Sequence, residues 1–208
     1  KIQRAENLIY LGDFNSGLSI LKELEKSNLQ TNTNKKPETY ITTSGADPFL
    51  IHINDCHDCD IRSADSHSTY SALSLVEKLS NLQSKTKSKG QGSAQASFEI
   101  ANALYNISYY GNSRILFGAE DPIGTYGNMD QAEKYYVLAM NSSNDKEFKA
   151  KAAFMAAKTE RNRSFNLLYN ARLNSEHEVW TTDFLLENQD VTSFSPKYFE
   201  ILKKNFSK

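Results

Sequence analysis

Apolar residues recur along this chain at the three- and four-residue spacing of helices that bury one face. Within residues 2–26 this spacing occurs in two short stretches separated by Gly12 and Asp13, which predicts two helices joined by a tight turn. The Asp13 carboxylate can cap the second helix. The apolar stripe of that helix is then formed by Leu18, Leu21 and Leu24.

The same spacing predicts six further helices. They cover about 68–85, about 94–110, a segment opened by Asn128 or Asp130, a segment capped by Asn144 or Asp145, about 176–188, and 196–206. Three stretches between them are rich in Gly, Pro, Ser or Lys and are predicted to be a linker or loops: 27–45, 84–93 and 118–128. Gly111 and Asn112 are expected to end the helix over 94–110 in a left-handed turn.

One short segment has a different pattern. After Asp47 and Pro48, the apolar residues Phe49, Ile51 and Ile53 alternate with their neighbours, which indicates an extended piece. No second strand is predicted to pair with it. The fold class expected for the chain is therefore all-α.

Two stretches resemble the tetratricopeptide repeat, a helix-turn-helix unit. The first consists of Ala5, Leu8, Gly12, Phe14, Gly17, Leu21 and Leu24, and the latter half of the pattern returns as Gly127, Met129, Ala132, Tyr136 and Ala139. The helix over 94–110, with Ala101 and Leu104, resembles the first helix of the second unit. The chain departs from the family pattern in having Gly17 at the tight crossing, long insertions between units, and no closing proline.

This resemblance implies an α-solenoid of helix pairs that binds another protein on a concave face within an assembly. It divides the chain into a first helix pair at 1–26, an irregular insertion at 27–67, and a helical region at 68–208, the last either separate from the first pair or continuous with it. The segments 54–60 and 148–157 are also similar to long uncharacterised bacterial proteins of the cell envelope, which implies a periplasmic or envelope location.

Charge and hydropathy exclude some partners. The chain has 24 Lys and Arg against 25 Asp and Glu, so its formal net charge is −1. This balance argues against a nucleic-acid surface, which carries a basic excess, and provides no field that attracts anionic lipids. Its longest apolar runs are a few residues, too short to span a membrane. Because the chain begins at Lys1, we expect a piece of a longer or processed protein.

One segment concentrates side chains of the kinds that bind metals. Residues 52–67 contain three of the four histidines and both cysteines: His52, Cys56, His57, Cys59 and His67. The Cys-x-x-Cys spacing can place two thiolates on a zinc ion, with histidines completing the site. The same spacing equally fits a disulfide between Cys56 and Cys59 in an oxidising compartment. A redox-active dithiol activated by His57 is a third alternative, and reduced, solvated side chains are the fourth.

A tyrosine-rich central region allows two interpretations. Its members are Tyr105, Tyr109, Tyr110, Tyr135 and Tyr136. They form either a peptide-binding groove or a helix-packing layer whose hydroxyls reach water, which we favour. Residues 160–163 form either an exposed anchor for a partner carboxylate or an exposed helix end, which we favour.

The function expected from the sequence is that of a non-enzymatic scaffold or adaptor that binds another protein. The segment at 52–67 would then act as a local staple, by zinc or by disulfide, and no other cofactor is expected. A metal- or thiol-dependent enzyme using Cys56, His57 and Cys59 is one alternative. The other is a purely structural subunit of an envelope machine.

Overall fold

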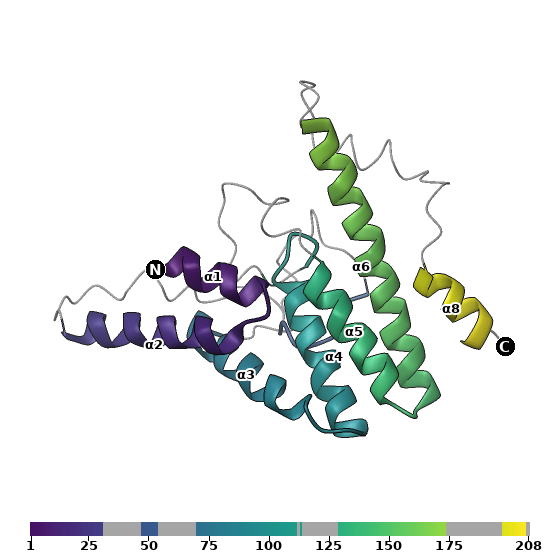
Figure 1. The fold of residues 1–208 in the computed structure, drawn as a ribbon, viewed down its shortest axis with the longest axis horizontal. Helices are drawn as coiled ribbons and strands as arrows, with labels where there is room; N and C mark the ends of the chain where they lie inside the picture. Colours follow the sequence, from purple (N-terminus) through teal and green to yellow (C-terminus); the bar gives the residue numbers. More distant parts are fainter. Residues whose placement is uncertain (31–46, 54–69, 112, 114–128, 174–196, 207–208) are drawn as a thin grey trace.

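All the regular secondary structure in the described part of the chain is helical (Figure 1). The computed structural model describes residues 1–30, 47–53, 70–111, 113, 129–173 and 197–206. Within these ranges there are seven helices and no strand, which confirms the all-α prediction. The helices are α1 (Ile2–Tyr10), α2 (Phe14–Gln30), α3 (Ala72–Lys85), α4 (Gln91–Asn106), α5 (Asp130–Ser142), α6 (Lys146–Leu173) and α8 (Lys197–Phe206).

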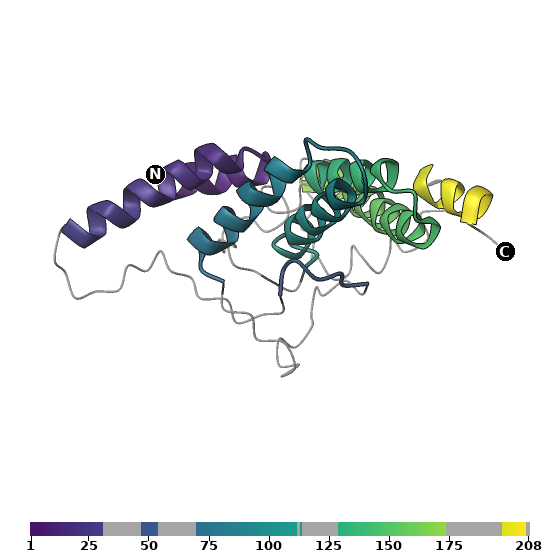
Figure 2. The same cartoon turned by 90° about the horizontal axis from the view of Figure 1, so that it is seen from below.

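The helices lie side by side in chain order. The closest contacts join α1 to α2, α2 to α3, and so on through α5 and α6 to α8. Figure 2 shows this arrangement from below, with α1 and α2 at one end and α8 at the other. Residues 47–53 run across one side of this layer, beneath α4 and toward α6.

The turn between α1 and α2 follows the prediction. Gly12 has a φ of 82°, a left-handed conformation that glycine adopts without strain. The Asp13 carboxylate accepts a hydrogen bond from the Ser16 N–H at 3.2 Å, which satisfies one free donor of the first turn of α2. At the crossing of the two helices, Gly17 faces Ile9 so closely that an added Cβ would lie 3.0 Å from it. Helix α2 extends to Gln30, four residues beyond the predicted end.

Two loop predictions around α3 and α4 need correction. Helix α3 begins at Ala72, where Ser71 and Ser74 form reciprocal capping hydrogen bonds, rather than near residue 68. The loop predicted over 84–93 is confined to 86–90, because α4 already begins at Gln91. Within the first turn of α4, the Ser93 hydroxyl donates to the Thr86 carbonyl at 3.1 Å and ties the two helices together.

The end of α4 also differs from the prediction. The helix stops at Asn106, four residues early, and Gly111 does not adopt a left-handed conformation. Instead the chain folds back, and the Ser113 N–H donates to the Asn106 carbonyl at 2.9 Å. A Cβ on Gly111 would lie only 2.3 Å from Asn106. The glycine is therefore needed for close approach of two backbone segments, not for a left-handed turn.

Helix α5 begins at Asp130, and helix α6 is capped by Asp145, whose carboxylate accepts hydrogen bonds from two N–H groups of its first turn. Because α6 continues to Leu173, residues 160–163 lie within it, and the expectation of an exposed helix end is wrong. Helix α8 covers 197–206 of the helix predicted at 196–206. The predictions at 118–128 and 176–188 lie outside the described residues.

Helix α4 is the centre of the hydrophobic core. Twelve of its residues are buried, on all of its sides. Helices α3 and α5 cover two of these sides, and residues 47–53 cover a third. A helix enclosed in this way has apolar residues all round, and any polar side chain on it needs a partner inside the protein.

None of the described helices combines the length and the apolar character needed to cross a membrane.

Candidate functional site

The candidate site is the face of α4 and α6 that holds residues 47–53, here called the anchor segment. A turn begins the segment: the Leu50 N–H donates to the Asp47 carbonyl at 3.2 Å, and the Phe49 N–H donates to the Asp47 carboxylate at 2.9 Å. Asp followed by Pro is a common start for such turns, because the short carboxylate reaches its own backbone two residues on. Beyond the turn, the segment has no regular secondary structure.

Two asparagines of α4 bind the backbone of the anchor segment. The Asn106 side-chain amide donates to the carbonyls of Pro48 at 2.8 Å and Leu50 at 2.9 Å. The Asn102 amide donates to the Phe49 carbonyl at 3.0 Å. Residues four apart on a helix share one face, so the two amides lie in a row along the segment. Three successive carbonyls are thereby bound.

A lysine of α6 binds the other end of the segment. The Lys158 ammonium donates to the carbonyls of His52, at 3.3 Å, and Ile53. It also lies over the Tyr105 ring of α4, 4.8 Å from the centroid, in cation–π geometry. The side chain is only 4% exposed. The three donors that bind the segment's backbone are called the main-chain clamp: Asn102, Asn106 and Lys158.

Buried hydrogen bonds hold the clamp in position. The Tyr136 hydroxyl of α5 donates to the Asn102 side-chain oxygen at 2.8 Å, which leaves the Asn102 amide directed at Phe49. The Asn162 amide of α6 donates to the Tyr105 hydroxyl at 2.9 Å, behind Lys158. Asn102 and Lys158 are thus positioned by neighbouring helices, whereas the buried side-chain oxygen of Asn106 has no hydrogen-bond partner among the described residues.

The tyrosines of the central region are therefore packing residues, as favoured from the sequence. The sequence also predicted that their hydroxyls reach water, and for three of them this is wrong. Tyr105, Tyr110 and Tyr136 are buried, and their hydroxyls bond to asparagine side chains.

Two neighbouring residues of the anchor segment, Pro48 and Phe49, are buried. The Phe49 ring is 4% exposed and lies 5.3 Å from the Tyr70 ring. The Lys78 ammonium of α3 lies 3.8 Å from the Phe49 centroid and donates to the Tyr70 hydroxyl at 2.9 Å. By contrast, the side chains of Leu50 and Ile53 are 54% and 61% exposed.

His52 is the one predicted metal ligand that the described residues include. Its Nε2 atom is buried and has no hydrogen-bond partner among them. Burial lowers the pKa of His52 from its ordinary value, a hydrogen bond with the Asp47 backbone opposes this, and the positive charge of Lys158 lowers the pKa further. The shift favours the neutral imidazole.

The rest of the predicted metal or disulfide site, Cys56, His57, Cys59 and His67, lies outside the described residues. Within the described ranges, no three His, Cys, Asp or Glu side chains come close enough together to hold a metal ion.

Sequence reasoning missed the clamp. The one available signal was that Asn102 and Asn106 fall among the apolar positions of a predicted helix, where an amide needs a buried partner. The identity of that partner was not visible, because a backbone carbonyl has no side-chain signature. Chemically, the clamp consists of hydrogen-bond donors aimed at carbonyls, which is an arrangement for holding a chain.

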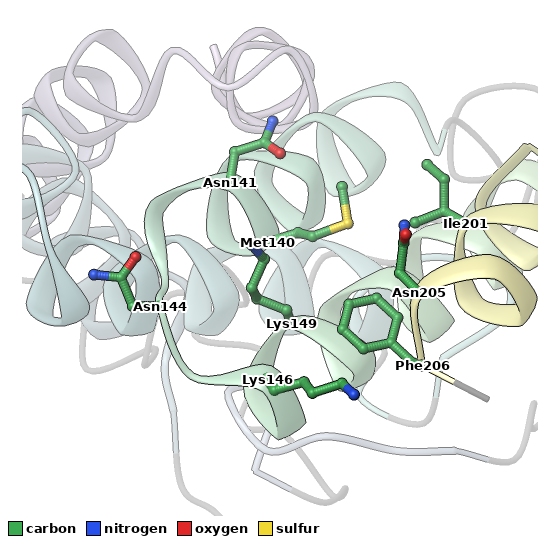
Figure 3. Close-up of a pocket in the computed structure, with 8 residues that line it drawn as sticks. All are labelled: Met140, Asn141, Asn144, Lys146, Lys149, Ile201, Asn205 and Phe206. Carbon is green, nitrogen blue, oxygen red and sulfur yellow. The ribbon is translucent and has the colours of Figure 1, made fainter. Parts of the chain in front are cut away.

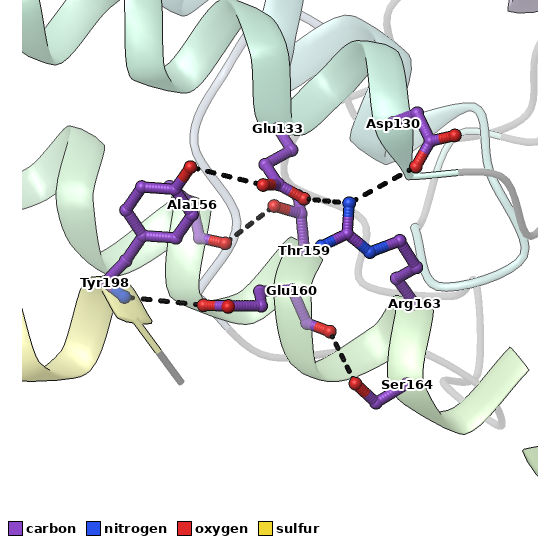
Figure 4. Close-up of polar contacts among 8 residues, drawn as sticks. All are labelled: Asp130, Glu133, Ala156, Thr159, Glu160, Arg163, Ser164 and Tyr198. Carbon is purple, nitrogen blue, oxygen red and sulfur yellow. Dashed lines mark hydrogen bonds and ion pairs between the residues drawn. The ribbon is translucent and has the colours of Figure 1, made fainter. Parts of the chain in front are cut away.

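A second polar cluster attaches α8 to the layer (Figure 4). The Glu133 carboxylate of α5 forms an ion pair with Arg163 of α6 at 2.7 Å and accepts a hydrogen bond from the Tyr198 hydroxyl of α8 at 3.2 Å. Burial raises the pKa of Glu133, and the charge of Arg163 and the Tyr198 hydroxyl oppose that rise. Burial and the neighbouring Glu133 charge raise the pKa of Tyr198 to about 12, so its hydroxyl remains a donor at neutral pH. This cluster has a structural role in docking α8.

An open cavity of about 620 Å³ lies where the end of α5 and the start of α6 meet α8 (Figure 3). Its polar lining consists of amides and two lysines, Lys146 and Lys149, beside apolar side chains such as Phe206. The start of α6 is already capped by Asp145. Unlike the α4–α6 face, this cavity holds no segment of the described chain.

The chain was also compared with known proteins. It matches no protein-family model, no curated protein and no solved structure.

Proposed function

We propose that this chain is a non-enzymatic scaffold or adaptor that binds another protein on its helical layer, within a larger assembly of the bacterial envelope. The observation that carries the proposal is the main-chain clamp. Three buried side chains from two helices donate to five carbonyls of the anchor segment, which lies more than 50 residues away in the sequence.

The clamp supports binding because its donors are already in place. Asn102 is oriented by Tyr136, and Lys158 is stacked on Tyr105. Fixing these side chains before a ligand arrives reduces the conformational entropy lost on binding. Because the helices contact one another in chain order, the layer also supports the interpretation as helix-pair repeats of the tetratricopeptide type, whose units stack on their neighbours.

The proposal is tested by affinity purification of the tagged chain from the cells that make it. Wild-type chain is compared with Asn106→Ala, which removes one clamp donor, and with Asn166→Ala. Asn166 is a matched control because it is a buried α6 asparagine that bonds to the Tyr110 hydroxyl at 2.5 Å and does not contact the anchor segment. We expect a stoichiometric partner with wild type and with Asn166→Ala, and a changed yield with Asn106→Ala, whose amide also binds residues 47–53 of the chain itself.

A second pair of variants separates scaffold from enzyme. Cys56→Ser and Cys59→Ser are expected to lower the melting temperature and to leave partner capture intact at low temperature. Failure to recover any stoichiometric partner, or loss of a thiol-dependent turnover in folded Cys56→Ser chain, would contradict the scaffold function.

A further inference from the structure

We propose that the main-chain clamp is the binding site for a peptide segment of a partner protein, anchored by one aromatic side chain, and that residues 47–53 occupy this site as an internal competitor. This inference rests on the proposed scaffold function and names the partner's chemistry and its regulation. The anchor segment is the template for the ligand, because its contacts show what the site accepts.

The clamp itself does not select side chains. All five of its hydrogen bonds end on carbonyl oxygens, those of Pro48, Phe49, Leu50, His52 and Ile53. Every residue has such a carbonyl, so any chain that follows the same path can make these bonds. Of the apolar side chains, Leu50, Ile51 and Ile53 are 54%, 37% and 61% exposed. Substitution at these positions should therefore have little effect on the fit.

Selection is concentrated at Pro48 and Phe49, the two buried residues of the segment, and is strongest at the aromatic ring of Phe49. This ring packs against both the Lys78 ammonium and the Tyr70 ring, which also contact each other, and it is nearly fully buried. An ammonium over an aromatic face is attracted by the ring's quadrupole, an effect that an aliphatic side chain cannot reproduce. The ligand must therefore present an aromatic residue at this point.

The positive charge of the site restricts further which ligands it accepts. The site contacts the segment through two ammonium groups, Lys78 at the aromatic end and Lys158 at the other. Like charges brought close together in a partly buried site repel each other. A neutral or acidic partner segment is therefore accepted, and one with Lys or Arg beside these groups is rejected.

The internal segment must leave before a partner can bind. A tethered segment has an effective concentration in the millimolar range for short linkers. It therefore raises the apparent dissociation constant of any partner that uses the same bonds. A substitution that weakens the contacts of residues 47–53 with the clamp should therefore free the clamp for a partner.

The test is fluorescence anisotropy with a labelled synthetic peptide of the sequence of residues 46–53. The full chain is used as wild type, as Phe49→Ser, as Phe49→Ser with Asn106→Ala, and as Phe49→Ser with the control Asn166→Ala. We expect Phe49→Ser to bind the peptide at least about tenfold more tightly than wild type, because the internal competitor is weakened. Addition of Asn106→Ala should remove at least about tenfold of that affinity, since two hydrogen bonds are lost, and addition of Asn166→Ala should not.

A second peptide, with alanine in place of phenylalanine, tests the aromatic requirement and should bind at least about tenfold more weakly, as expected for loss of a buried aromatic anchor. If Phe49→Ser does not fold, Asp47→Ala replaces it, since it removes the carboxylate that binds the Phe49 N–H and leaves the Phe49 ring and the backbone bond of the turn in place. Equal binding by wild type and the released variant, or equal binding of the two peptides, would overturn the proposal. Concentration-dependent dimers of wild type that dissociate on addition of peptide would show instead that the occupant is a second copy of this chain.

The two proposals fail separately. A partner that is captured from cells equally well by Phe49→Ser and by Phe49→Ser with Asn106→Ala would leave the scaffold function standing and remove the clamp as its site. Peptide binding at the clamp without any stoichiometric cellular partner would confirm the clamp as a peptide site and contradict the scaffold function.

Discussion

The Asn106 side-chain amide donates to the Pro48 carbonyl at 2.8 Å, although the two residues are 58 positions apart in the chain. This bond places a backbone segment that has no regular secondary structure against the most enclosed helix of the layer. It leaves the Phe49 side chain buried and the next side chain, Leu50, exposed. The position of the segment therefore depends strongly on the side-chain amide of Asn106.

Asn106→Ala should release the anchor segment. The Pro48 and Leu50 carbonyls lose their shared donor, and removal of one partner of a buried hydrogen bond costs about 1–3 kcal/mol. Hydrogen exchange followed by mass spectrometry should show faster exchange at the amides of residues 49–53 in this variant. In Asn166→Ala, the amides of the segment should keep their wild-type rates. Unchanged exchange in Asn106→Ala would mean that the segment is held by other contacts.

Lys158→Met should lower stability although it keeps the volume of the side chain. The variant loses the donor to the His52 and Ile53 carbonyls and the cation–π contact with Tyr105, so we expect a loss of about 1–3 kcal/mol. Lys151→Met, on an exposed position of the same helix, should stay within about 0.5 kcal/mol of wild type. Urea unfolding of the three chains measures both values. Equal stabilities would show that the buried ammonium contributes nothing net.

Gly111→Ala should destabilise the fold, because its Cβ would lie 2.3 Å from the Asn106 backbone, where no side-chain rotation can relieve the clash. Overpacking of this kind costs about 1–3 kcal/mol, which is about 2–4 °C of melting temperature per kcal/mol in a chain of this size. Gly92→Ala is the control, since nothing lies within 4 Å of its added Cβ in α4. That variant should be neutral or slightly more stable, because alanine favours the helix. Thermal unfolding by circular dichroism distinguishes the two.

The Glu133 carboxylate should make a pH-dependent contribution to stability. Its folded-state pKa is raised above the ordinary value of 4.5, mainly by burial, so the folded chain holds this proton more tightly than the unfolded chain. Its contribution is therefore fully present below about pH 4.5 and is lost as pH rises through the raised pKa.

The comparison chain is Glu133→Gln, which does not titrate at this position. Between pH 4 and 7, the stability of wild type minus that of Glu133→Gln should fall as pH rises, measured by urea unfolding at each pH. A difference that instead grows with pH would mean that the Arg163 ion pair outweighs the cost of burial.

Much of the fold follows from local patterns in the sequence. The apolar positions of α3 (Leu75, Val76, Leu79 and Leu82) are buried as their spacing predicts. The caps at Asp13 and Asp145 lie where short acidic side chains precede an apolar run. These features are predictable because a helix and its cap involve residues at most a few positions apart. Gly111 shows the limit: its sequence context resembles a helix-ending turn, and only the fold reveals that it is a close-approach glycine.

The candidate site depends on the tertiary structure instead. His52 was selected from the sequence as a metal ligand, but the structure places it in a segment whose backbone is bound by Asn102, Asn106 and Lys158. These residues are 53 to 106 positions from the carbonyls that they bind. Because the bonds end on the main chain, the identities of the bound residues carry no trace of them. The sequence by itself thus determined the helices. Only their packing around α4 decided which amides and which lysine would bind the backbone of residues 47–53.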